Sequence, residues 1–190
     1  MCPAAVIPAD TVHEVVRGAR VGRLVHVAPE SAPGARLTAS VRAHTVQEWA
    51  RAGAELFSDP DWFEEIHRSV TVAATSDRHP AVSHVLALLP HRLESGPVRL
   101  ADLAREARLS ESLLAHVFSA DVGLPLRPYI RWLRMQRAIR FIADGHNFTT
   151  AAHGAGFADS AHLTRFCRSM FGAPPSDFTR VRWTIAPEVS

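Results

Sequence analysis

The apolar positions of the segment Gly156–Ser176 repeat at the spacing of an amphipathic helix. If the helix begins at Ser160, its apolar side chains recur at intervals of three and four residues: Leu163, Phe166, Cys167, Met170 and Phe171. The opposite side carries small, hydroxyl and guanidinium groups: Ala161, Thr164, Arg165 and Arg168. The pattern predicts a short helix with a basic outer face, which ends at Gly172 before two prolines.

The same spacing predicts a series of helices through residues 80–183. The expected segments are Ala81–Leu93, Leu100–Ala107, Glu111–Ala120, Pro125–Asp144, Thr149–Ala155, the helix from Ser160, and Asp177–Val181. Ser110 is the expected N-cap of the third segment, and Gly123 is expected to end it. The inner side of this segment is expected to be formed by Leu113, Leu114, Val117 and Phe118. The fourth segment is apolar on nearly all sides, which is typical of a helix buried between two bodies. We therefore expect a mainly α, seven-helix domain in which two helix–turn–helix units are joined by a long linker helix.

The pattern before residue 80 is weaker and predicts a small mixed region. The segments expected there are a strand at Gly22–Val27, a loop at Pro29–Gly34, a helix at Thr38–Phe57 and a turn with a helix start at Asp59–Asp61. The predicted organisation is an N-terminal region of residues 1–79, a helical domain of residues 80–183 and a tail of residues 184–190.

Charge is distributed unevenly along the chain. Residues 98–183 contain 12 arginines and seven acidic residues, whereas residues 1–97 contain nine arginines and 11 acidic residues. The sequence contains no lysine. The basic excess lies in the same region as the predicted basic helix, as neutralisation of nucleic-acid phosphates requires.

Several classes of protein are disfavoured by the composition. Cys2 and Cys167 lie far apart in sequence, so we expect neither a disulfide framework nor a zinc cluster, and a cytoplasmic location fits best. No apolar run reaches the length of a membrane span, and the N-terminus lacks the pattern of a secretory signal. The 11 histidines form no metal-binding spacing, and no GxSxG, P-loop or GxGxxG pattern is present. We therefore expect no metal, no cofactor and no catalysis.

Three blocks of the C-terminal region resemble the AraC/XylS family of transcription regulators. The blocks are LADLAREARLSESLLAHVFSADVG (Leu100–Gly123), PYIRWLRMQRA (Pro128–Ala138) and GFADSAHLTRFCRSMFGAPPSDF (Gly156–Phe178). The last block follows the second helix–turn–helix signature of the family almost position by position. The resemblance implies a DNA-binding domain that inserts one helix of each unit into successive major grooves on one face of the duplex.

The resemblance also implies which residues contact DNA. In the first unit these are Ser112, Ala115 and His116; in the second they are Ser160, Ala161, His162, Thr164, Arg165 and Arg168. The family usually has arginine at the position of His116 and often a basic residue near Ser119, whereas Arg165 matches the family. We therefore expect the second unit to supply most of the affinity, with Arg165 as a candidate for bidentate contact with guanine. His116 can bind a base when neutral, or a phosphate when protonated.

The leading hypothesis is a sequence-specific transcription regulator that binds double-stranded DNA, with RNA polymerase as a further candidate partner. The alternative is an effector- or partner-binding regulatory protein whose first helix–turn–helix unit contributes little to DNA binding. Many relatives carry an N-terminal cupin-like barrel, and His26–Leu37 resembles only the end of one. Because most of such a barrel is missing, we expect no intact small-molecule pocket. The operator sequence, the choice between activation and repression, and the oligomeric state stay open.

Four features have both a structural and a functional interpretation. Arg127, Arg131 and Arg134 share one side of the linker helix, where they can bind phosphate or pair with carboxylates. His153 is expected to be packed and neutral, and Gly154 is expected to weaken the helix that contains it. Cys167 is expected to lie in the core. Trp49 and Trp62 are expected to be core or docking aromatics.

Overall fold

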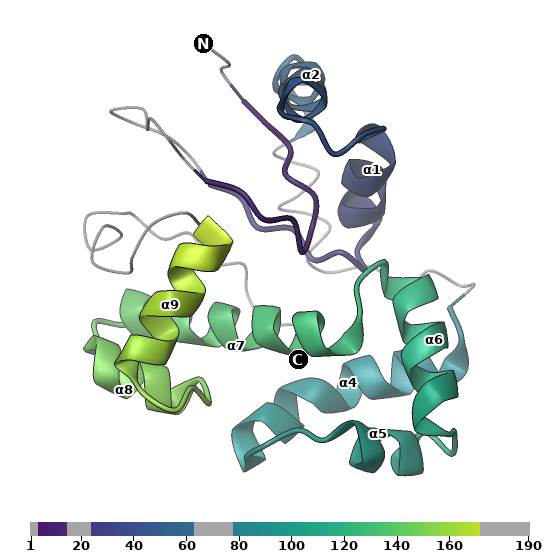
Figure 1. Ribbon diagram of the computed structural model, residues 1–190, viewed down its shortest axis with the longest axis vertical. Helices are drawn as coiled ribbons and strands as arrows, with labels where there is room; N and C mark the ends of the chain where they lie inside the picture. The colour runs from purple at the N-terminus through teal and green to yellow at the C-terminus, as the bar shows by residue number, and fades with distance from the viewer. Residues whose placement is uncertain (1–3, 15–23, 63–77, 172–190) are drawn as a thin grey trace. The chain divides into compact units, whose positions relative to one another are not determined.

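The computed structural model describes residues 4–14, 24–62 and 78–171 (Figure 1). All regular secondary structure in these ranges is helical, which confirms the predicted mainly α class. The described residues fall into two compact units. The first holds residues 4–11, 24–62 and 78, and the second holds residues 12–14 and 79–171.

The first unit contains helices α1 (Ala32–Ser40) and α2 (Val46–Phe57). The predicted single helix over residues 38–57 is therefore wrong, because the chain leaves the helical conformation after Ser40. The Thr45 side chain then accepts a hydrogen bond from the Glu48 amide and starts a new helix. Helix α1 also begins inside the predicted loop, because the Ser31 side chain accepts from the amide of Gly34.

The predicted strand at residues 22–27 is also wrong where the structure describes it. Residues 24–28 have no regular secondary structure, and residues 22 and 23 lie outside the described ranges. The carbonyl of Ala28 accepts from both the amide and the hydroxyl of Ser31. These bonds turn the chain into α1 instead of extending it along a partner strand. The predicted turn near Asp59 is confirmed, since its side chain accepts from the Asp61 amide at 3.1 Å and its carbonyl accepts from the Trp62 amide. Trp62 is buried, as expected of a core aromatic.

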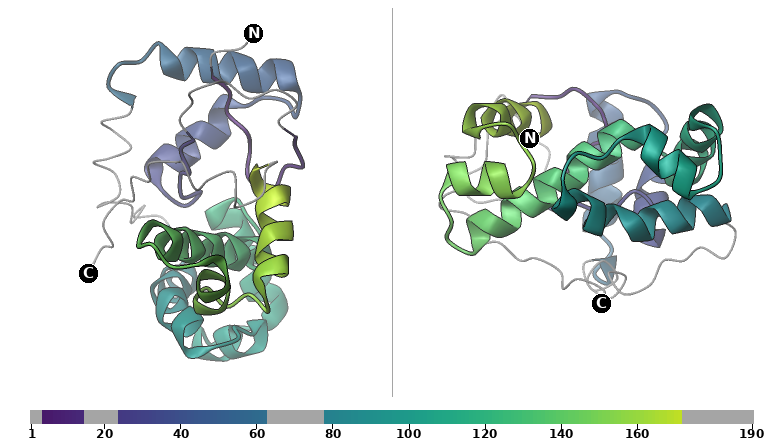
Figure 2. Two further views of the ribbon diagram at one scale, coloured as in Figure 1. Left: turned by 90° about the vertical axis from the view of Figure 1, so that its left-hand side faces the viewer. Right: turned by 90° about the horizontal axis from the view of Figure 1, so that it is seen from below.

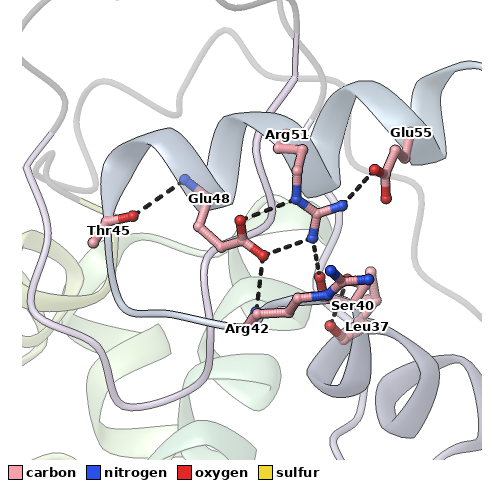
Figure 3. Close-up of polar contacts among 7 residues, drawn as sticks. All are labelled: Leu37, Ser40, Arg42, Thr45, Glu48, Arg51 and Glu55. Carbon is pink, nitrogen blue, oxygen red and sulfur yellow. Dashed lines mark hydrogen bonds and ion pairs between the residues drawn. The ribbon is translucent and has the colours of Figure 1, made fainter.

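Arg51 joins the end of α1 to α2 (Figure 3). Its guanidinium donates to both carboxylate oxygens of Glu48, at 2.6 and 2.9 Å, and also contacts Glu55. A further bond, of 2.7 Å, goes to the carbonyl of Ser40 near the end of α1. Glu48 in turn accepts from the backbone amide of Arg42. Hydrogen bonds from Arg51 and from this amide lower the pKa of Glu48 to about 2.

We expect the stability of the first unit to fall as the pH is lowered from about 5 towards 2, because Glu48 loses its charge there. A lowered pKa means that the carboxylate stabilises the folded state above its ordinary pKa, and that this contribution disappears on protonation. Thermal unfolding of the full chain at pH 7 and pH 3 measures the effect. Glu48→Gln should show a weaker pH dependence than wild type, whereas Glu55→Gln, which keeps the Arg51–Glu48 pair, should not. Equal pH dependence in wild type and Glu48→Gln would contradict the assignment.

The second unit is formed by six described helices. They are α4 (Pro80–Ser95), α5 (Leu100–Glu106), α6 (Glu111–Val122), α7 (Leu126–Ala143), α8 (Phe148–Gly154) and α9 (Ser160–Phe171). They confirm the first six predicted helices of this region, with ends that differ by at most two residues. The predicted helix at residues 177–181 and the predicted helix end at Gly172 lie outside the described residues.

Local sequence signals fix the ends of these helices. The Ser110 side chain accepts from the Leu113 amide and caps α6, as predicted, and Gly123 ends α6 with a φ of 73°. Asn147 caps α8 through its side chain, which accepts from the amide of Thr150. At the start of α4, the backbone amide of His79 donates to the carboxylate of Asp121 at 2.7 Å.

Helix α7 contributes to two separate hydrophobic cores, which confirms the linker helix that the sequence predicts. Its first half packs with α4, α5 and α6, and the large buried side chains of this core are Val82, Val85, Leu89, Leu103, Leu114, Phe118, Tyr129 and Ile130. Its second half packs with α8 and α9 through Met135, Ala138, Ile139, Ala151, Ala152, Phe157, Leu163, Cys167 and Phe171. In Figure 1, α6 and α9 lie near opposite ends of α7.

Candidate nucleic-acid interface

The first helix–turn–helix unit consists of α5 and α6. The turn between them contains Arg108 with a φ of 55°, and the Leu109 amide donates to the carbonyl of Ala104. Helix α6 buries Leu114, Phe118 and Val122, which recur every four residues along one side. Leu113 was expected on this inner side, but 45% of it is exposed, because it lies at the edge of the narrow stripe that these residues form.

The second unit consists of α8 and α9. Gly156 turns the chain between them with a φ of 80°, and Phe157 after it is buried. The Asp159 carboxylate accepts from the His162 amide at 2.6 Å and so caps α9. Helix α9 then buries Leu163, Cys167 and Phe171.

The structure places the predicted DNA-contacting residues on the outer sides of these two helices. Ser112, His116, Ala161, His162, Arg165 and Arg168 are exposed, whereas Ala115, Ser160 and Thr164 are half-buried. The Thr164 hydroxyl donates to the carbonyl of Ser160 at 2.8 Å, so its proton is used inside the helix and its oxygen is available as an acceptor. The His162 ring packs edge-on against the buried Phe157 ring, with 5.3 Å between centroids.

The outer sides of α6 and α9 differ in charge. Arg165 and Arg168 on α9 are exposed, and within the described residues neither has an ion-pair partner. Near α5, Arg92 of α4 pairs with Glu106 and Arg105 pairs with Asp102, whereas the exposed Arg99 and Arg108 form no ion pair within the described residues. The outer side of α6 carries no arginine and begins with the exposed carboxylate of Glu111. Of these two helices, α9 alone carries arginine.

Two residues of α8, the helix that packs against α9, differ from what the sequence predicts. His153 is exposed, so the predicted packed histidine is wrong. Gly154 does not simply weaken α8: a Cβ at this position would lie 2.5 Å from the tip of the Phe141 ring, so glycine lets α8 approach α7 closely. Cys167 is buried against Met135, as predicted, and burial raises the pKa of its thiol to about 12.

Three arginines of α7 line a cavity of about 460 Å³. They are Arg127, Arg131 and Arg134, and the other lining residues are Val98, Pro128 and Ile130, so no carboxylate among the described residues contributes to the wall. The Arg131 guanidinium lies over the Phe166 ring of α9 at 6.0 Å. The Nε of Arg134 is buried and makes no hydrogen bond within the described residues. The prediction that these arginines share one side of α7 is confirmed.

Two features bear on metals and membranes. In the part of the chain that the structure describes, no three histidine, cysteine or acidic side chains cluster as metal ligands would. None of the described helices combines the length and the hydropathy that crossing a bilayer would demand.

Comparison with known proteins identifies relatives of the C-terminal region. Residues 103–180 match the family model described as a helix-turn-helix domain. Over 103 residues, which are 53% of this chain and 33% of the relative, the chain is 34% identical to an AraC-like transcription regulator of Streptomyces lividans. Over 106 residues, 55% of this chain and 31% of the relative, it is 27% identical to the transcriptional activator NphR of a Rhodococcus species. The chain therefore spans about a third of the length of these relatives.

Two solved structures share the fold. The C-terminal domain of AraT, a response regulator from Geobacillus stearothermophilus, aligns with a TM-score of 0.52 at 14% identity, over 57% of this chain and 91% of that domain. The C-terminal domain of the response regulator yesN from Fusobacterium nucleatum aligns with a TM-score of 0.50 at 17% identity, over 54% of this chain and all of that domain. The comparisons confirm the resemblance and the helical fold that the sequence predicts.

Gly154→Ala should destabilise the protein, by about 1 kcal/mol or more, because the added methyl group overlaps the Phe141 ring. An exposed helix without this contact would be stabilised by the same change, since alanine favours a helix by about 1 kcal/mol over glycine. The measurement is thermal unfolding of wild type, Gly154→Ala, Phe141→Leu and the double variant. If the clash is real, the substitutions are not additive, and Phe141→Leu relieves part of the cost of Gly154→Ala. A more stable Gly154→Ala variant would show that the close approach does not constrain this position.

Proposed function

We propose that this chain, which contains an AraC-type helix–turn–helix domain, is a sequence-specific DNA-binding transcription regulator. In this proposal residues 80–183 are the DNA-binding domain, residues 1–79 are a separate N-terminal region and residues 184–190 are a tail. Its partners are double-stranded DNA and RNA polymerase, and its place of action is the cytoplasm. The observation that carries the proposal is the pair of exposed arginines on α9, which have no ion-pair partner in the described structure.

Helix α9 is the principal recognition helix of the proposed complex. Its inner side is held by buried side chains and its first turn by the Asp159 cap, so the outer side is presented by a well-packed support. Two arginines fit the two functions that a recognition helix combines, a base contact and a phosphate contact. We assign the base contact to Arg165, whose planar guanidinium can donate two hydrogen bonds to the O6 and N7 atoms of guanine.

Helix α6 contributes shape and hydrogen bonding rather than permanent charge. Ser112 and His116 are exposed and can hydrogen-bond base edges, and Ala115 offers a methyl group that suits contact with the methyl group of thymine. The carboxylate of Glu111 stabilises the start of the helix but repels a nearby phosphate. The first helix–turn–helix unit therefore adds a preference for particular DNA bases but contributes little electrostatic attraction to the DNA.

The arginine-lined cavity on α7 fits a backbone phosphate between the two units. Three guanidiniums gather at one wall of this cavity, and a guanidinium donates strong charge-assisted hydrogen bonds to phosphate oxygens. The cavity lies beside Phe166 of α9 on one side and beside Val98, just before α5, on the other. Exposed Arg127 makes no ion pair within the described residues and is the arginine best suited to such a contact.

A second candidate function rests on Leu113. This side chain is 45% exposed on the uncharged side of α6, where an apolar group also suits a protein partner. In this alternative the first unit contributes little to DNA binding and instead contacts a partner protein. A regulator that uses only α9 would recognise one short DNA segment instead of two.

Arg165→Ala should weaken binding to the preferred sequence by about 1–3 kcal/mol and relax selection at one guanine position. Selection of bound sites from random DNA first supplies the preferred sequence, and gel shift of the full chain then measures the affinities. His116→Ala is the matched change on α6 and should cost less, because it removes a hydrogen-bonding group but no permanent positive charge. Unchanged affinity in Arg165→Ala would contradict the assignment of α9 as the principal recognition helix.

Arg127→Ala should weaken binding about equally for all sequences and reduce the slope of log K against log salt by about 1. The measurement is gel shift or anisotropy over a range of salt concentrations with the preferred site and with an unrelated duplex. Arg92→Ala removes the same charge from α4, where the arginine pairs with Glu106, and serves as the control. A loss confined to one sequence would mean that Arg127 contacts a base instead of a phosphate.

A further inference from the structure

Arg137, in the second half of α7, contacts helices that belong to both hydrophobic cores. Its Nε donates a hydrogen bond of 2.7 Å to the carbonyl of Gly154, the last residue of α8. Its Nη1 forms an ion pair of 3.1 Å with Glu94 near the end of α4. Helix α4 belongs to the first core and α8 to the second. One guanidinium therefore connects the ends of two helices, α4 and α8, that belong to different cores.

The surroundings of Arg137 hold this guanidinium in place. Its Cζ lies over the Phe141 ring at 5.9 Å, and the same ring lies against Gly154. The planar guanidinium fixes the directions of its donors, so the Gly154 and Glu94 acceptors are held in a defined arrangement. The Gly154 carbonyl lies at the C-terminus of α8, where a helix leaves carbonyl groups without partners and favours positive charge.

We infer that Arg137 is a positioning residue that fixes the orientation of the second helix–turn–helix unit relative to the first, and thereby the spacing of the two DNA segments that the chain recognises. This inference rests on the proposed DNA-binding function. Two recognition helices on one face of a duplex require segments about one helical turn, 10–10.5 base pairs, apart. One inserted base pair moves the second segment by about 3.4 Å along the duplex and rotates it as well. Two units held in a fixed orientation lose affinity when the second segment is displaced, whereas two units that can move relative to each other keep most of their affinity.

The continuous helix α7 offers a competing explanation of any spacing preference. It passes through both cores, and its packing alone could hold the two units in place. In that case the loss of Arg137 would lower stability, or lower affinity by the same factor at every spacing, and would leave the penalty for an inserted base pair unchanged. The spacing profile therefore separates a positioning role from a merely structural one.

The experiment measures affinities of the full chain for a series of duplexes. The preferred site is taken from selection on random DNA, and base pairs are inserted or deleted between its two segments. Wild type is compared with Arg137→Met, which keeps an unbranched stem over Phe141 but removes both polar contacts. It is also compared with Glu94→Ala, which removes only the contact to α4 at an exposed position. Arg92→Met is the control, because the ion pair of Arg92 with Glu106 joins α4 to α5, and both helices belong to the first core.

We expect wild type to lose roughly tenfold or more in affinity for one inserted base pair, since simultaneous engagement of linked modules contributes about 100-fold or more. In Arg137→Met that penalty should be at least about threefold smaller, and Glu94→Ala should show a smaller change in the same direction. Arg92→Met should keep the wild-type profile. Parallel losses at every spacing in Arg137→Met overturn the inference. If Arg137→Met does not fold, an unchanged profile in Glu94→Ala overturns it. Absence of sequence-specific binding by wild type contradicts the proposed function itself and is recognised before any variant is compared.

Discussion

The shared helix α7 is the constraint on which the packing of residues 79–171 depends. Its first half completes the core of α4, α5 and α6, and its second half completes the core of α8 and α9. A helix of seven residues such as α5 or α8 cannot be stable alone, because helix initiation costs more than so few backbone hydrogen bonds return. Each of these short helices gains its stability from burial against a neighbour. The two recognition helices are therefore supported by cores that have α7 in common.

The contacts between α7 and α8 show how this support becomes specific. Gly154 and Phe141 set the distance between the two helices, and Arg137 closes the end of α8 while it also contacts Glu94 of α4. Packing determines the distance, and the guanidinium adds direction, which apolar contacts define poorly. The exposed ion pair alone contributes little, but the hydrogen bond to a helix-terminal carbonyl adds a charge-assisted interaction. The contacts of Arg137 with Gly154 and Glu94 thus add to the cores a restraint on the orientation of α8 relative to α4.

Much of the helical structure of residues 79–171 can be predicted from the sequence because the signals that define each helix are local. The spacing of Leu114 and Phe118 gives the inner side of α6, and Ser110 and Gly123 give its ends. The contribution of Gly154 escapes prediction because it depends on Phe141, which is 13 residues away and on another helix. The same holds for Arg137: its partners lie 17 and 43 residues away, so its sequence context does not distinguish it from the neighbouring arginines of α7. Leu113 fails for a different reason, since periodicity locates the centre of an apolar stripe better than its edge.

The N-terminal compact unit, which includes residues 24–62, was harder to predict because its local sequence favours both strand and helix. Leu24–Val27 has the composition of a strand, yet a strand also needs a neighbour with which to share backbone hydrogen bonds. The hydrogen bonds between Ala28 and Ser31 turn the chain into a helix directly after this segment. In residues 79–171, by contrast, burial leaves little freedom, and arginine side chains gather on the outer side of α9 and on the cavity wall of α7. Charge that the fold does not neutralise internally costs stability through mutual repulsion. Its position beside two outward-facing helices is what a phosphate backbone, with its regular negative charge, would compensate.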